Sequence, residues 1–199
     1  MKKLLATLLA VAPALTFAGP TTWNLDPTHS TTGFAVKHLV ISTVRGDFKK
    51  FTGAVQLDDK DVTKSTVEAT IDAGSIETGV ADRDGHLKSP DFLDVAKYPT
   101  ITFKSTKVAK AGKDALKVTG DLTLHGVTKP VTLAVTTSQE VKGMFGETRR
   151  AFAATTKISR KEFGLTWNKL VEAGPAVGDE IAVTFDLEGV KDQPKTAAK

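Results

Sequence analysis

The sequence predicts an all-β fold in which about eight antiparallel strands close into a barrel. The first observation is an alternation of apolar and polar residues. It is clearest in 181–188, where Ile181, Val183, Phe185 and Leu187 share one face of a strand. Such a strand buries one face and exposes the other. The same period of two residues recurs around residues 34–38, 51–57, 67–71, 101–103, 116–124, 131–135 and 152–158.

The second observation is that short turn sequences separate these stretches. They are Asp58–Lys60, Ala111–Lys113, His125–Gly126 and Val141–Gly143, which contain residues that tight turns use. Strands joined so closely are antiparallel. A long open sheet would leave exposed edges that favour aggregation, so closure into a barrel is the economical arrangement, with a two-sheet sandwich as the alternative.

Two segments interrupt the alternation, and we expect both at an end of the barrel. The first, residues 82–99, predicts a short helical insert near residues 81–95. Asp82 and Asp84 favour the start of a helix through its dipole, whereas Pro90 and Pro99 limit how far it runs. The second, residues 159–168, predicts a helical turn near residues 160–165.

Residues 1–18 have the pattern of an export signal, because Lys2 and Lys3 precede an apolar run that ends in small residues. The apolar run over 4–15 is too short to span a bilayer, which needs about 20 apolar residues. No transmembrane anchor is therefore expected after cleavage. The mature chain would be residues 19–199, and its length of 199 − 18 = 181 residues fits a single domain.

Composition excludes several classes of function. The chain has no cysteine, which excludes thiol chemistry and thiolate metal sites. Loss of Lys2 and Lys3 would lower the basic count from 27 to 25 against 23 acids, so the formal net charge would fall from +4 to +2. The remaining basic residues are scattered, with few aromatic residues among them, so nucleic acid is not expected as a partner.

The inward-facing residues of the predicted barrel are apolar, which is the chemical character of a lipid site. An eight-stranded barrel can be filled by its own side chains or can hold one small ligand. Small inward residues such as Gly53, Ala69, Gly120 and Ala154 favour residual space, and the alternative is a close-packed core without a cavity. The residues expected to line the cavity are Phe34, Val36, Phe51, Val55, Ile71, Phe103, Leu122, Leu124, Leu133, Phe152, Trp167 and Phe185.

Four residues are candidates for the rim of the cavity or for contact with a ligand head group: His38, Arg45, Arg83 and His86. Arg83 and His86 are three residues apart and would share a face of a helix. A guanidinium group binds phosphate through paired hydrogen bonds, and an imidazole offers a single donor that depends on pH. The alternative is that Arg83 and His86 fasten the insert to the barrel. In the same way, His38 could meet a strand carbonyl or water, and Arg45 could pair with Asp47.

An ordered set of motifs runs along the chain: Leu25–Ser30, His38, Val44–Phe48, Asp82–Arg83, His86–Leu87, Asp91–Leu93, Lys97–Pro99 and Gly120–Val131. Together they resemble the YceI-like family of bacterial proteins, from about residue 23 to residue 190. The resemblance implies a lipocalin-like barrel that binds a polyisoprenoid or another long-chain amphiphile, with its tail inside and its head group near the opening. It also implies a periplasmic location for members with an export signal, a homodimer as one arrangement, and no catalytic machinery or cofactor.

Other kinds of function are weighed against lipid binding. The four histidines have neither the helix spacing nor the strand spacing of metal ligands, so no metal site is expected. Asp84 and His86 are close in sequence, but no nucleophile elbow, phosphate loop or pair of acids accompanies them, so a hydrolase is not indicated. The remaining alternative is a structural, stress or secretion factor whose barrel is filled by side chains.

Overall fold

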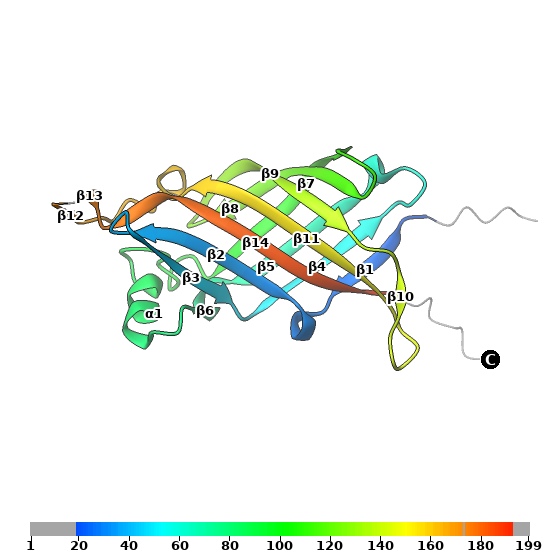
Figure 1. The fold of residues 1–199 in the computed structure, drawn as a ribbon, viewed down its shortest axis with the longest axis horizontal. Coiled ribbons are helices and arrows are strands. Elements are labelled where there is room, and N and C mark those ends of the chain that lie inside the picture. The colour runs from blue at the N-terminus through cyan, green and yellow to red at the C-terminus, as the bar shows by residue number, and fades with distance from the viewer. Residues whose placement is uncertain (1–18, 173, 193–199) are drawn as a thin grey trace, which may run out of the picture.

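A computed structural model describes residues 19–172 and 174–192 and shows an elongated β-barrel with one short helix at one end (Figure 1). The expected export signal, residues 1–18, lies outside the described residues. The strands and the helix are β1 (Thr21–Leu25), β2 (Thr31–His38), β3 (Ser42–Phe48), β4 (Phe51–Leu57), β5 (Thr66–Asp72), β6 (Ile76–Glu77), α1 (Ala81–Lys88), β7 (Thr100–Lys110), β8 (Ala115–Leu124), β9 (Val127–Thr137), β10 (Val141–Lys142), β11 (Thr148–Ser159), β12 (Leu170–Val171), β13 (Gly174–Pro175) and β14 (Val177–Lys191). Short 3-10 turns are η1 (Pro27–His29), η2 (Val62–Lys64), η3 (Ala73–Ser75) and η4 (Arg160–Phe163).

Eight strands form a closed antiparallel ring in the order β11-β9-β8-β7-β5-β4-β1-β14, and pairing of β14 with β11 completes it. This closure confirms the predicted eight-stranded barrel and is incompatible with a two-sheet sandwich. We call this pairing of β11 with β14 the seam of the barrel. It is long, because the two strands stay in register from Arg149 opposite Val190 to Ser159 opposite Glu180. On its other side β14 pairs with β1 near its carboxyl end and with β2 before that, and β2 carries β3 and β6.

The alternation of the sequence explains which side chains face inward. On β11, Phe152 and Ala154 are buried while Ala151 and Ala153 are exposed, because successive residues of a strand point to opposite faces. The buried residues of the barrel gather into three apolar clusters, built around Phe163, Trp23 and Val118.

The insert is helical over a shorter range than expected. Helix α1 covers Ala81–Lys88 and turns follow it up to Pro99, whereas the sequence predicts helix near residues 81–95. Pro90 explains the difference, because proline disfavours the helical conformation of the residue before it, and Ser89 is extended. The predicted turn near residues 160–165 is confirmed as η4, which Gly164 ends at a φ of 79°.

The bend between β1 and β2 is fixed by Asp26. Its carboxylate accepts hydrogen bonds from the Thr28 backbone (3.0 Å), from the His29 ring (2.9 Å) and from the Arg149 guanidinium (2.9 Å). Arg149 also donates to Glu188 on β14. Hydrogen bonds from the Thr28 hydroxyl and from His29, together with Arg149, hold the pKa of Asp26 well below its usual range. The bend is thus tied to the seam of the barrel.

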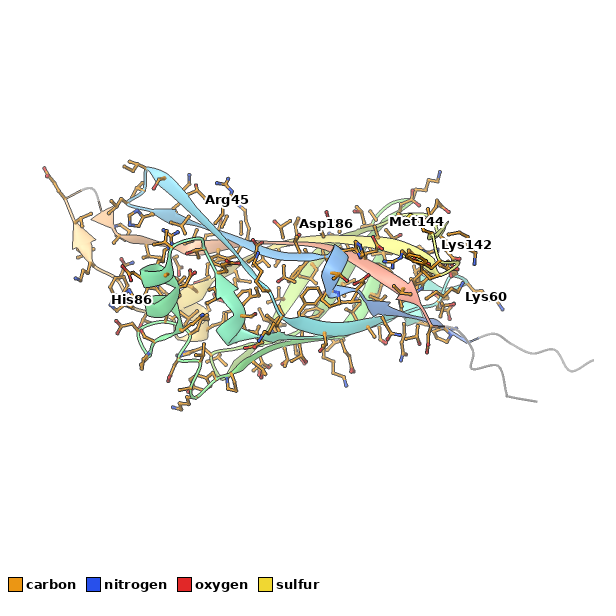
Figure 2. The ribbon with its side chains drawn as sticks, turned by 90° about the horizontal axis from the view of Figure 1, so that it is seen from below. Arg45, Lys60, His86, Lys142, Met144 and Asp186 are labelled. Carbon is orange, nitrogen blue, oxygen red and sulfur yellow. The ribbon has the colours of Figure 1, made fainter. Side chains whose placement is uncertain are left out.

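Because the pKa of Asp26 is depressed in the folded state, its contribution to stability is complete above the unfolded-state value of about 4. This contribution is lost as the pH falls through the lower pKa of the folded protein. We expect Asp26→Asn to lower the free energy of unfolding at pH 7 by about 2 kcal/mol. As the pH falls, the free energy of unfolding of this variant should also decrease less than that of the wild type. Urea unfolding at several pH values measures both effects, with the exposed strand residue Asp186 (Figure 2) replaced by Asn as the control. Identical acid profiles for wild type and Asp26→Asn would contradict this role.

Candidate functional site

The barrel encloses an apolar cavity of about 240 Å³. A single water needs about 10–15 Å³ by the same kind of measure, so the cavity is much larger than a packing defect. It extends over the inner faces of strands from all around the ring. Eleven of the residues expected from the sequence line it: Phe34, Val36, Phe51, Val55, Ile71, Phe103, Leu122, Leu124, Leu133, Phe152 and Phe185.

Trp167 is the expected lining residue that does not line the cavity. Its ring packs against the rings of Phe92, at 5.0 Å, and His86, at 4.9 Å. Of these three residues, Phe92 lines the cavity. Trp167 lies in the irregular segment after η4, where the inward and outward alternation of a strand does not apply. It therefore supports the lining from behind.

Two of the small residues that were expected to leave space do not do so. A Cβ on Gly120 would lie 2.5 Å from the Phe103 ring, and a Cβ on Gly53 would lie 3.0 Å from a Leu25 methyl group. These glycines make room for neighbouring side chains. Ala69 and Ala154, in contrast, do line the cavity. The free space thus comes from the width of the barrel and from its alanines.

The insert covers the cavity at the barrel end that carries α1, which we call the helix end (Figure 1). Three apolar side chains of the insert, Leu87, Phe92 and Leu93, line the cavity, and Phe92 and Leu93 are buried. The polar side chains of α1 do not line the cavity, and His86 among them is exposed (Figure 2). The segment that breaks the strand pattern is therefore part of the cavity wall.

Arg83 and His86 make their hydrogen bonds within the insert and with Thr78, which precedes it. Arg83 donates from Nε to the Thr78 hydroxyl (2.7 Å) and from Nη2 to the Thr78 carbonyl (2.9 Å). The carboxylate of Asp84 accepts from the Thr78 backbone N–H at 2.9 Å. His86 Nε2 lies 2.8 Å from a carboxylate oxygen of Asp91. These contacts favour a fastening role, with partners in the insert rather than on the barrel strands.

His38 and Arg45 lie outside the cavity lining. His38 is exposed at the last position of β2, where the strand leaves the barrel. Arg45 pairs with Ala35 across β2 and β3, on the face opposite to the lining residue Phe34, and projects outward (Figure 2). It contributes to a hollow on the outer surface with Asp47. Neither residue is placed to contact a tail inside the barrel.

The charged residue in the cavity wall is Arg160, which the sequence analysis did not single out. Of the described residues that line the cavity it alone is charged, and it is 2% exposed. Its guanidinium donates to the carbonyls of Gly178 (2.9 Å), Trp167 (2.9 Å), Val177 (3.3 Å) and Leu165. Burial lowers the pKa of this guanidinium, and the charge of Asp179 opposes that effect.

A signal for Arg160 was present in the strand pattern. The inward residues of β11 are Phe152, Ala154, Thr156 and Ile158, and one further step of two residues reaches Arg160. The sequence analysis ended the alternation at Ile158, because the helical turn begins just after it.

β1, which contains Trp23, lies at the end of the barrel opposite to α1, and we call this end the Trp23 end (Figure 1). Trp23 is completely buried and meets Phe152 edge to face at 6.3 Å. The Arg150 guanidinium and the Lys191 ammonium lie 5.1 and 5.4 Å from the Trp23 ring centre. The two ends thus differ, because Trp23 packs behind lining residues such as Phe152 at one end and a buried guanidinium lies near the other.

One group of possible metal ligands occurs in the described residues, and its ligand atoms lie within 4.8 Å of one another. It consists of Asp26, His29 and Glu188. Arg149 already occupies this group, because its Nη1 donates to both Asp26 and Glu188. The group therefore acts as an ion-pair network at the β1–β2 bend.

Comparison with known proteins agrees with the barrel and its motifs. The family model described as a YceI-like domain matches residues 23–189. The chain belongs to the YceI-like family. It is 41% identical to the YceI protein of Salmonella newport over 163 residues, which cover 82% of each chain.

Solved structures share the YceI-like barrel. The crystal structure of Burkholderia cenocepacia BcnA is similar at a TM-score of 0.74 and 27% identity, over 82% of this chain and 98% of that one. A polyisoprenoid-binding domain from Saccharophagus degradans, implicated in plant cell wall breakdown, is similar at a TM-score of 0.62. It covers 85% of this chain and 98% of its own length at 18% identity, so this likeness concerns the fold alone.

One YceI-like motif has a clear structural role at the end of the insert. Tyr98, from the motif Lys97–Pro99, packs its ring against His125 at 4.6 Å. A Cβ on Gly126 would lie 2.4 Å from the Tyr98 ring, and Gly126 has a φ of 74°. The β8–β9 turn therefore requires glycine at this position for conformation and for space. The motif anchors the insert to the barrel.

We expect Arg83→Ala to loosen the insert of this YceI-like barrel even when the cavity is empty. The change removes two hydrogen bonds from a charged donor to Thr78, each worth about 1.5 kcal/mol or more. Amide hydrogen exchange within residues 78–93 should then become about tenfold faster or more. Exchange measured by mass spectrometry tests this, with Arg45→Ala as the matched control. Unchanged exchange in the empty Arg83→Ala protein would contradict the fastening role.

Proposed function

We propose that this protein binds the hydrocarbon tail of a polyisoprenoid or a similar long-chain amphiphile inside its barrel and carries it after export. The observation that supports this most strongly is the continuous apolar cavity, which the insert covers at one end. The export pattern in residues 1–18 supports a periplasmic location. None of the helices in the described part of the chain is long and apolar enough to cross a membrane.

The energetics of the cavity favour a ligand over empty space. Unfilled core volume costs about 24 cal/mol per Å³, so a cavity of about 240 Å³ corresponds to a cost on the order of 6 kcal/mol. Each buried methylene of a ligand contributes about 0.8 kcal/mol. A long tail would therefore bind tightly with little polar recognition, whereas a purely structural barrel would gain stability by filling the space.

The cavity wall supports binding rather than catalysis. The described lining residues include neither a carboxylate nor a histidine. The polar residues among them are Thr32, Ser65, Thr102, Thr137, Thr156 and Arg160. An activated nucleophile needs an adjacent general base to accept its proton, and the described lining residues supply none. The polyisoprenoid-binding barrel of Saccharophagus degradans offers a precedent for binding in this fold.

Filling the cavity from within should abolish ligand binding. Ala154 is buried and lines the cavity on β11, whereas the neighbouring Ala153 is exposed. We expect geranylgeraniol at a hundredfold excess over its Kd to raise the Tm of the wild type by about 5–10 °C. In Ala154→Phe, where the added ring occupies the path of the tail, this increase should be lost. Overpacking should itself cost about 1–3 kcal/mol of stability.

Ala153→Phe is the matched control, because the same ring is then added on the outside of the same strand. It should retain the increase in Tm. If neither geranylgeraniol nor longer prenols stabilise the wild type, the carrier proposal is wrong and a structural role takes its place. If Ala154→Phe is stabilised as strongly as the wild type, the ligand does not occupy the barrel.

A further inference from the structure

The β10–β11 hairpin presents two large apolar side chains to solvent. Residues 143–147, which we call the hairpin tip, carry Met144 and Phe145, which are 93% and 90% exposed. They are the two most exposed large apolar side chains of the described residues, and Val141 at the base of the hairpin is exposed as well. The hairpin lies at the Trp23 end, where Figure 2 shows Met144. Exposed apolar patches rimmed by polar residues mark sites that contact a protein or a membrane.

The hairpin tip is held in one conformation by Glu147. The carboxylate of Glu147 accepts a hydrogen bond from the Phe145 backbone N–H at 3.0 Å and from Arg149 Nε at 2.8 Å. The backbone N–H of Gly143 donates to the Glu147 carbonyl at 2.8 Å, and Gly146 has a φ of 86°, which glycine adopts without strain. A fixed turn of this kind loses little conformational entropy when its apolar side chains meet a partner.

Strand register places the start of the barrel domain at the same end as the hairpin tip. Trp23 pairs with Lys191 on β14, the next residue of β14, Val190, pairs with Arg149, and Arg149 pairs with Val141. The start of β1 and the hairpin tip both extend beyond this row of paired residues in the same direction. Both therefore project from the Trp23 end (Figure 1).

The two segments of the chain outside the described residues join the barrel at this end, and their sequences suit a bilayer. Residues 1–18 contain an apolar run and lead into β1. Residues 193–199 follow β14 and contain Lys195 and Lys199 and no acidic residue. Apolar segments partition into a bilayer, and lysines near its surface are attracted to anionic lipids. These sequences favour a bilayer over a protein as the partner of the Trp23 end.

The charges of the hairpin are also complementary to an anionic surface. The ammonium group of Lys142 donates to the Thr148 hydroxyl at 2.7 Å, and no described carboxylate forms an ion pair with it. The acidic residues of the hairpin and its approach, Glu140 and Glu147, are each paired with basic side chains. The positive charge of Lys142 is thus left to attract anionic groups beside Met144.

We propose that the hairpin tip inserts into the surface of an anionic phospholipid bilayer. Met144 and Phe145 enter the boundary of the acyl chains, and Lys142 meets the head groups. This inference goes beyond the proposed function, because it concerns the outside of the barrel and does not depend on a lipid in the cavity. The Trp23 end then lies on the bilayer, and the helix end with its insert points away from it (Figure 1).

A fluorophore placed at the hairpin tip tests this contact directly. Because the chain has no cysteine, Met144→Cys can carry a single NBD label, whose emission shifts to the blue when it leaves water. On vesicles of equal parts of phosphatidylethanolamine and phosphatidylglycerol, this label should shift to the blue. Leu170→Cys is the matched control, because Leu170 is 86% exposed on β12 at the helix end, and its label should not shift (Figure 1). An unshifted label at position 144, or an equal or larger shift at position 170, would overturn the proposal.

Sedimentation with the same vesicles gives a second readout on unlabelled protein. Phe145→Ser should weaken vesicle binding about tenfold or more, because one large apolar side chain no longer leaves water. Lys142→Gln should weaken it about fivefold, and added salt should weaken it further. Leu170→Ser should bind as the wild type does. Unchanged binding of Phe145→Ser, or an equal loss in Leu170→Ser, would overturn the proposal. Neither readout requires a ligand in the barrel, so either result leaves the carrier proposal untouched.

Discussion

The structure depends on strand β14, because this strand closes the barrel. It pairs with β11 along the seam and with both β1 and β2 on its other side. The ion-pair network of Asp26, Arg149 and Glu188 joins the β1–β2 bend to this seam. Closure removes open edges from the ring and forces alternate side chains of eight strands into one interior. The cavity is a consequence of that closure.

The alternation of the strands predicted the barrel and most of its lining, because a period of two residues relates sequence directly to the inner and outer faces. The prediction was weakest where strands end. Trp167 lies beyond the last regular pairing of β11, and His38 lies where β2 leaves the barrel, so neither side chain follows the alternation inward. Arg160 was missed for the same reason, although it continues the inward series of β11. Contacts between distant segments, such as Tyr98 on Gly126, cannot be read from local pattern at all.

The two ends of the barrel differ in the side chains that surround the cavity. The Trp23 end holds a buried aromatic ring whose basic neighbours, Arg150 and Lys191, pair with acidic side chains. The helix end combines the apolar underside of the insert with the buried guanidinium of Arg160. In the proposed function, affinity comes mainly from the transfer of the tail from water into this apolar space.

The central claim is that the barrel interior is a binding site for a long-chain lipid and not a packing defect. Native mass spectrometry of the protein, purified without detergent, tests this claim most directly. The expected result is a discrete adduct with the mass of a long-chain lipid, present in the wild type and absent from a variant whose cavity is filled. The bare chain alone in the wild type, even after incubation with polyprenyl phosphates, would contradict the claim.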